Sequence, residues 1–92
     1  MKRTERFNKL KLREMCIEHD WFTAGTNEEY NQLFRLADDF ASHDNENDRN
    51  WKLAAMASLI YHCSTVTSTR EYDVFDIMSA LQLCVIVRFE AV

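Results

Sequence analysis

The feature that most constrains the fold is an apolar run near the middle of the chain, Trp51 to Cys63. Every residue from Leu53 to Ile60 is apolar or small, whereas a helix on the surface of a protein keeps a polar face. We therefore expect a central helix that other helices surround on nearly all sides. Crossing a bilayer takes about 20 apolar residues, and Lys52 and His62 bracket this shorter run. The run predicts the core of a soluble protein.

Length and turn residues narrow the fold class. A chain of 92 residues forms one domain, residues 1–92, and its lack of proline and single glycine argue against a sandwich or barrel with many tight turns. The sequence predicts an all-α fold, a compact bundle of about four helices near residues 5–19, 27–41, 49–63 and 73–86. We expect these residues at the central contact: Phe34, Ala54, Ala55, Ser58 and Leu59. The β-branched tail from Leu83 to Phe89 leaves a last helical turn and an extended segment both open.

The most informative local stretch comes before the second predicted helix. Gly25 tolerates positive φ and precedes Thr26, which has Glu29 three positions later. This spacing predicts a capping box, in which Thr26 accepts from the Glu29 amide and the Glu29 carboxylate accepts from the Thr26 amide. Trp21 and Phe22 lie just ahead of the cap, and we expect them to fold back as an aromatic plug.

Other turns are marked by polar residues. Asn47 or Asp48 can cap the central helix, and Asp73 with Asp76 supplies the same chemistry to the last helix. The segment 64–70 holds too many β-branched and hydroxyl residues for a helix interior, so we expect a loop there.

Charge is unevenly distributed along the chain. Residues 1–14 carry a net charge of +4 and residues 15–48 a net charge of −8, within a total of −4. An acidic protein does not suit direct nucleic-acid binding, which depends on neutralising phosphates. An acidic surface can instead dock on a basic groove of another protein. The candidate docking residues are Glu28, Asp38, Asp39, Asp44, Glu46 and Asp48.

Cysteine and histidine residues raise two further hypotheses. Cys16 and His19 share one face of the first predicted helix, and with His62 and Cys63 they offer a tetrahedral zinc set. Buried core thiols are the preferred interpretation, because the chain has no Cys-x-x-Cys clip and free cysteine is usually buried. We therefore expect no metal and no cofactor. A thiol nucleophile would need an oxyanion pocket, for which no glycine-rich turn is present, so we expect no enzyme.

Two features bear on the compartment. Residues 1–14 lack the apolar core of a secretory signal, and three cysteines without regular spacing fit reduced thiols. We expect a cytoplasmic location and no membrane contact.

One motif resembles a known group of proteins: Trp21-Phe22-x-x-Gly25-Thr26-Asn27-Glu28-x-Tyr30-x-x-Leu33-Phe34. Similar motifs occur in small uncharacterised proteins of Gram-positive bacteria and their phages and mobile elements. The resemblance covers roughly residues 10–41 and implies origin more than mechanism. In size and acidity the chain also resembles anti-CRISPR proteins.

These observations lead to two hypotheses of function. The first is an inhibitor that docks its acidic surface on the basic groove of a larger host protein, a nucleic-acid enzyme of host defence. The second is a structural or regulatory interaction module, a homodimer formed through Leu83 to Phe89.

Overall fold

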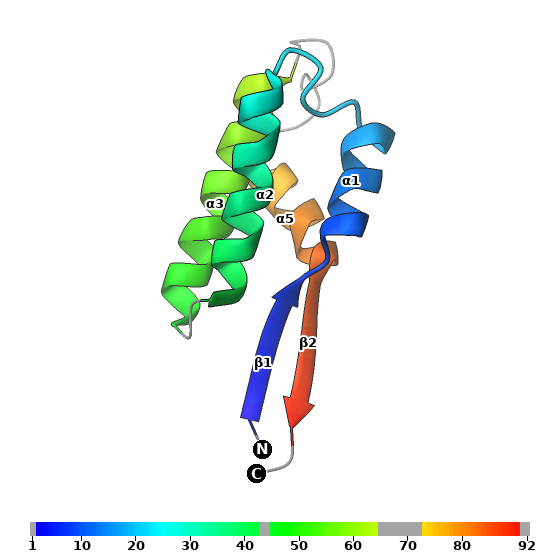
Figure 1. Cartoon of the computed structure of the whole chain (residues 1–92). Coiled ribbons are helices and arrows are strands. Elements are labelled where there is room, and N and C mark those ends of the chain that lie inside the picture. Colours follow the sequence, from blue (N-terminus) through cyan, green and yellow to red (C-terminus); the bar gives the residue numbers. More distant parts are fainter. Residues whose placement is uncertain (1, 43–44, 65–72, 91–92) are drawn as a thin grey trace.

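The computed structural model describes residues 2–42, 45–64 and 73–90. In chain order the elements are β1 (Lys2–Phe7), α1 (Lys9–Glu18), α2 (Asn27–Ser42), α3 (Glu46–Cys63), α5 (Val74–Leu81), the 3-10 turn η1 (Gln82–Cys84) and β2 (Val85–Glu90). Helices α2 and α3 form an antiparallel hairpin, α1 and α5 lie beside it, and the two strands project from the helices (Figure 1). Among the described residues, no helix is both long and apolar enough to cross a membrane.

The strands form an antiparallel ribbon that joins the two ends of the described chain. The register pairs Phe7 with Val85 at the base and Lys2 with Glu90 at the tip. Because directly opposed residues point to the same face, Phe7, Val85 and Glu5 share the face that meets the helices. The Phe7 and Phe40 rings pack edge to face there, with 5.6 Å between their centroids.

The ribbon corrects the all-α prediction. The described part is mostly helical. Residues 2–7 form β1, however, although the first helix was expected to begin near residue 5, and α1 begins only at Lys9. The last predicted helix ends at Leu81 instead of continuing to residue 86, and the tail takes the extended alternative. A strand needs a partner strand to satisfy its backbone groups, so each of these segments determines the conformation of the other.

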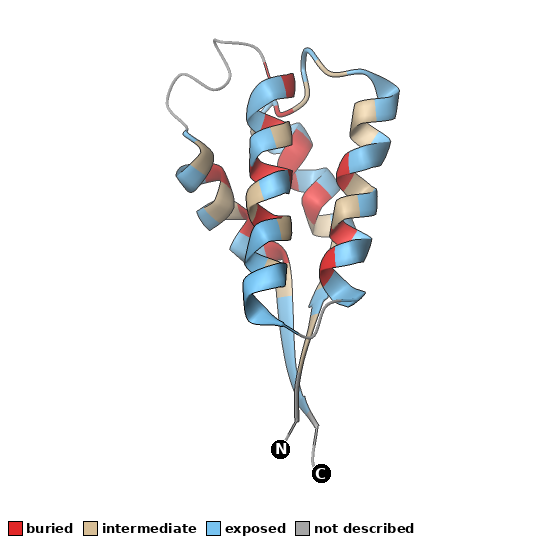
Figure 2. Cartoon of the chain, turned by 90° about the vertical axis from the view of Figure 1, so that its left-hand side faces the viewer, coloured by how far each residue is buried: buried red, intermediate tan, exposed pale blue. Residues whose placement is uncertain are grey.

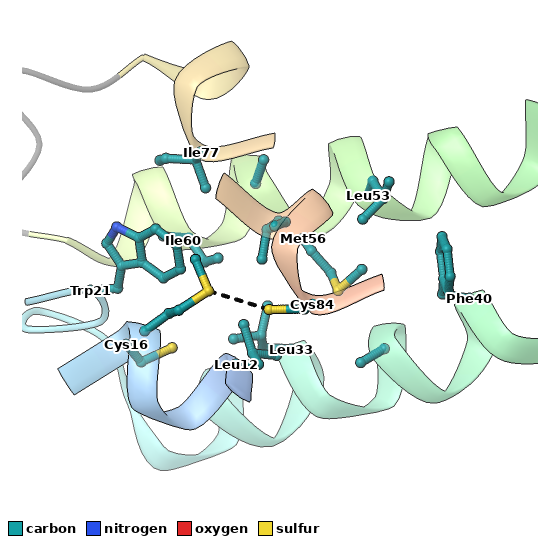
Figure 3. Packing of buried hydrophobic residues seen from close by; sticks show 14 residues of the cluster. Leu12, Cys16, Trp21, Leu33, Phe40, Leu53, Met56, Ile60, Ile77 and Cys84 are labelled. Atoms are coloured by element: carbon teal, nitrogen blue, oxygen red, sulfur yellow. Dashed lines mark hydrogen bonds between the residues drawn. The ribbon is translucent and has the colours of Figure 1, made fainter. Parts of the chain in front are cut away.

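The core lies where all the helices meet. It draws Leu12 from α1, Leu33 and Phe40 from α2, Met56 from α3 and Ile77 from α5, each almost completely buried (Figure 3). The contributing residues of α2 recur at helical spacing, as its sequence predicts.

Helix α3 is not surrounded on all sides. It buries the stripe Leu53, Met56, Ala57, Ile60 and Cys63. Of the predicted central contact, Phe34 and Leu59 are partly buried and pack against the core, and Ala54 is half-buried, but Ala55 and Ser58 are exposed, so the prediction was wrong for these two. The buried residues recur at helical spacing and form one face of α3, on which Ala57 is as completely buried as Met56 and Ile60. Figure 2 looks onto the uncovered side of the hairpin.

The helix caps follow the predictions in part. Asp73 and Asp76 form the expected capping box at the start of α5. Helix α3 begins earlier than expected, because Asn45, and not Asn47 or Asp48, accepts hydrogen bonds from the first free amides. Of the predicted loop 64–70, all residues after Ser64 lie outside the described part.

Candidate docking surface

The Trp21–Phe34 motif joins the turn after α1 to the end of α3. The Ala24 amide donates to the Cys63 carbonyl at 2.8 Å, and the Phe22 amide donates to the Ser64 hydroxyl at 3.3 Å. These contacts supply partners to groups at the C-terminus of α3, where carbonyls lack intrahelical donors. The motif therefore has a structural role that accounts for its residue types.

Gly25 has a different role from the one predicted. Its φ is not positive; positive φ values occur at Asp20 (55°) and Phe22 (66°). A side chain at Gly25 would place its Cβ 2.7 Å from Phe22 Cδ1 and 2.9 Å from Cys63 Cβ. The position needs glycine because the turn passes against the end of α3.

The aromatic residues of the motif pack as a chain. Trp21 is buried, as expected of a plug, and stacks with His19 at 5.1 Å between ring centroids. Phe22 meets Tyr30 edge to face at 5.5 Å, and Tyr30 meets Phe34 at 4.8 Å. Edge-to-face pairs of this kind add about 0.5–1.5 kcal/mol beyond area burial. The Phe22–Tyr30 pair holds the turn after α1 against the first turn of α2.

The predicted capping box is confirmed and has an additional partner. The Glu29 amide donates to Thr26 Oγ1 at 3.1 Å, and the Thr26 amide donates to Glu29 Oε1 at 3.0 Å. The Cys63 thiol donates to the other carboxylate oxygen, Oε2, at 3.1 Å. These hydrogen bonds, first that from the Thr26 backbone and then that from Cys63, lower the pKa of Glu29 below its ordinary value of 4.5. The cap thus links α2 to the end of α3.

Glu29→Gln should flatten the acid limb of the stability profile. A carboxyl group whose pKa is lowered by folding stabilises the protein above its unfolded pKa, and this contribution disappears as pH falls through the folded pKa. Urea midpoints measured between about pH 6 and pH 3 should therefore fall less for Glu29→Gln than for the wild type. Glu28→Gln, which removes an exposed neighbouring charge, is the control. Identical profiles for the two variants would show that the cap is not coupled to folding.

The structure does not bring the four candidate zinc ligands together. Cys16 is buried on α1, and His19 stacks on Trp21. His62 is exposed, and the thiol of the adjacent Cys63 donates a hydrogen bond to Glu29. Within the described ranges, no three histidine, cysteine or acidic side chains are grouped as metal ligands would be.

The thiols are poor nucleophiles in this fold. Burial raises the pKa of Cys16 to about 12 and those of Cys63 and Cys84 to about 11. The Cys84 thiol donates to the Met15 sulfur at 3.3 Å (Figure 3). Because the thiolate is the reactive form, these thiols remain largely protonated near neutral pH.

The predicted acidic residues divide into two groups. Glu28 lies in the first turn of α2, and the ten residues that separate it from Asp38 span about 15 Å. The end of the α2–α3 hairpin carries the other predicted acids that the structure describes, and we call these four exposed residues the acidic end: Asp38, Asp39, Glu46 and Asp48. Asp44 lies outside the described residues.

Two members of the acidic end face the chain's own lysines. Lys9 Nζ lies 2.9 Å from Asp38 Oδ1, and Lys52 Nζ lies 3.7 Å from Asp39 Oδ2. All four side chains are substantially exposed, and ion pairs in such positions contribute little, with a median of about 0–1 kcal/mol. Both carboxylates can therefore exchange a lysine for a partner's cation at small cost.

Two contacts were not predicted from the sequence. Glu5 Oε2 lies 2.9 Å from Arg49 Nε, and the two side chains are only 9% and 14% exposed. This pair fastens the ribbon to α3. The other is the bond between Cys63 and Glu29. Each joins residues more than 30 positions apart, so neither has a local sequence signal.

No known protein family, curated protein or solved structure matches the chain.

Proposed function

We propose that the protein is a small non-enzymatic binding protein that docks its acidic end on a basic groove of a larger protein. The observation that carries the proposal is the grouping of Asp38, Asp39, Glu46 and Asp48 around the end of one hairpin. Complementary charge raises association rates and selects partners. Acidic residues in the first turn of α3 also favour its helix dipole, so they serve folding and docking together.

A binding role is also supported by the chemistry of the thiols. Cys16 and Cys63, the candidate thiol nucleophiles, are buried, and burial raises the pKa of each. The resemblance of the Trp21–Phe34 motif to phage and mobile-element proteins directs the proposal to an inhibitor of a nucleic-acid enzyme of host defence. The acidic end would then occupy the groove that takes a nucleic-acid backbone.

The test is capture from a Gram-positive host lysate, followed by binding measurements with the purified partner. Asp38→Asn, Asp39→Asn, Glu46→Gln and Asp48→Asn, combined in one variant, should slow association at least about tenfold and remove most of its salt dependence. Short duplex DNA should displace the wild-type protein. The fold should persist, since exposed substitutions change stability by about 0.5 kcal/mol or less each.

The matched control removes exposed positive charge from the ribbon. Arg6→Gln combined with Arg88→Gln should leave binding unchanged or faster, because both residues are exposed and would repel a basic groove. Lys9 is kept because it pairs with Asp38. If the ribbon variant loses binding while the acidic-end variant keeps it, the proposal is wrong.

A further inference from the structure

The uncovered side of the α2–α3 hairpin holds an apolar hollow. Its volume is about 440 Å³, and its lining includes no lysine, arginine or acid: Gln32, Leu36, Ala55, Ser58, Leu59 and His62. One helical turn or more beyond this lining, Trp51 is 74% exposed on the same face of α3. An exposed tryptophan beside an uncharged hollow on one molecule is the pairing that self-association requires.

The spacing of the outward stripe is the same in both directions along α3. Trp51, Ala55, Ser58 and His62 are separated by four, three and four positions, and they lie within one sector of the helix at 100° per residue. In side-chain size the stripe is large, small, small, large. A two-fold axis between Ala55 and Ser58 that makes two copies of α3 antiparallel therefore places Trp51 of each on His62 of the other.

The geometry points to a homodimer in which a second copy of this chain covers α3 through this stripe, with each Trp51 entering the partner's hollow at His62. Ala55 and Ser58 let the helices approach to about 8–10 Å at the crossing point. The indole then stacks on an imidazole, as Trp21 does on His19 within the chain at 5.1 Å. Most of this surface lies apart from the acidic end, although Asp48 precedes Trp51 by about one helical turn.

The composition of α3 supports the same arrangement. A helical segment that is apolar on nearly all sides is normally buried, yet within the described part of the chain α3 buries only the stripe Leu53, Met56, Ala57, Ile60 and Cys63. A standard interface buries roughly 800 Å² per partner. Given its 74% exposure, Trp51 supplies on the order of 150 Å² of that area, and Leu59, which lines the hollow, adds to it on the side of α2.

Sedimentation velocity from about 1 μM to about 1 mM tests the dimer over the weak-to-moderate affinity range. The wild type should shift from monomer to dimer, and Trp51→Ala should raise Kd about thirtyfold or more, as expected for a central tryptophan. Ser58→Arg should remain monomeric. Phe75→Ala is the control, because Phe75 is 76% exposed on α5 and does not line the hollow. Its Kd should stay within about twofold of the wild type.

Disulfide trapping tests the orientation. An equal mixture of Ala55→Cys and Ser58→Cys should cross-link faster than a mixture of Ala55→Cys and His62→Cys, because only the first pair is matched by the two-fold axis. The natural cysteines are buried and should not compete. The reverse order would overturn the arrangement. A wild type that stays monomeric, or a dimer that survives both Trp51→Ala and Ser58→Arg, would overturn the proposal and assign the hollow to another protein.

Discussion

Gly25→Ala is expected to destabilise the protein by about 2–3 kcal/mol, a large part of the stability of a small domain. The added methyl group would lie 2.7 Å from Phe22 Cδ1 and 2.9 Å from Cys63 Cβ. The Phe22 amide donates a hydrogen bond to the Ser64 hydroxyl, and Cys63 Cβ belongs to a buried helix end, so neither residue moves freely. Urea denaturation followed by tryptophan fluorescence gives the change in unfolding free energy.

The control for Gly25→Ala is the exposed neighbouring residue. Ala24→Ser should shift the free energy of unfolding by no more than about 0.5 kcal/mol, since the side chain at this position is exposed and the hydrogen bond from its amide to the Cys63 carbonyl is retained. Equal midpoints for Gly25→Ala and the wild type would mean that the turn does not pass this close to α3.

Glu5→Ala is expected to destabilise the protein by about 3 kcal/mol, because it leaves the Arg49 guanidinium in a site that is only 14% exposed without the carboxylate beside it. Asp38→Ala provides a matched comparison. Asp38 pairs with Lys9 at the same 2.9 Å, but those side chains are 61% and 48% exposed, so the change should be about 1 kcal/mol or less. Burial, and not distance, distinguishes the two pairs.

A double variant separates the pair from its surroundings. Glu5→Leu with Arg49→Met should recover most of the loss, since a hydrophobic replacement of a buried ion pair is often neutral. Calorimetry of Glu5→Leu, Arg49→Met and the double variant measures the coupling between the two residues. If Glu5→Ala and Asp38→Ala lose equal stability, the ribbon is not fastened to α3 by this pair.

The sequence predicts the helices better than the strands. The α2 stripe and both capping boxes have local patterns, and local patterns are sufficient to place them. Strand β1 has none, because Lys2–Phe7 consists mainly of charged residues that suit a helix equally well. Its conformation depends on β2, which lies about 80 positions later.

The orientation of α3 could not be predicted for a different reason. A hydrophobic stripe identifies the buried face only when the remaining faces are polar, and from Leu53 to Ile60 no face is charged. Tertiary contacts then decide, and Leu53, Met56, Ala57 and Ile60 point inward. Because no face of this segment is charged, the face that is not buried leaves uncharged surface in contact with solvent. That surface is the one through which we propose that α3 associates with a second copy.

The exposure of the candidate acidic residues was predicted more successfully than their arrangement in space. Asp38, Asp39, Glu46 and Asp48 are exposed, as their sequence context suggests. Their distance from Glu28 follows from the length of α2, and the lysines beside Asp38 and Asp39 come from α1 and α3. The net charge of a segment does not indicate which charged side chains lie next to one another in the folded protein.

The pairing of the first described strand with the last has a consequence for synthesis. Residues 2–7 are made before the other described elements, yet their partners in β2 are made about 80 positions later, and closing a loop of that length opposes pairing by on the order of 4 kcal/mol. Until then β1 has unpaired backbone groups, and its many charged side chains protect it from association with other chains. The helices of the hairpin, by contrast, are neighbours along the chain. The ribbon therefore cannot form before residues 85–90 have been made.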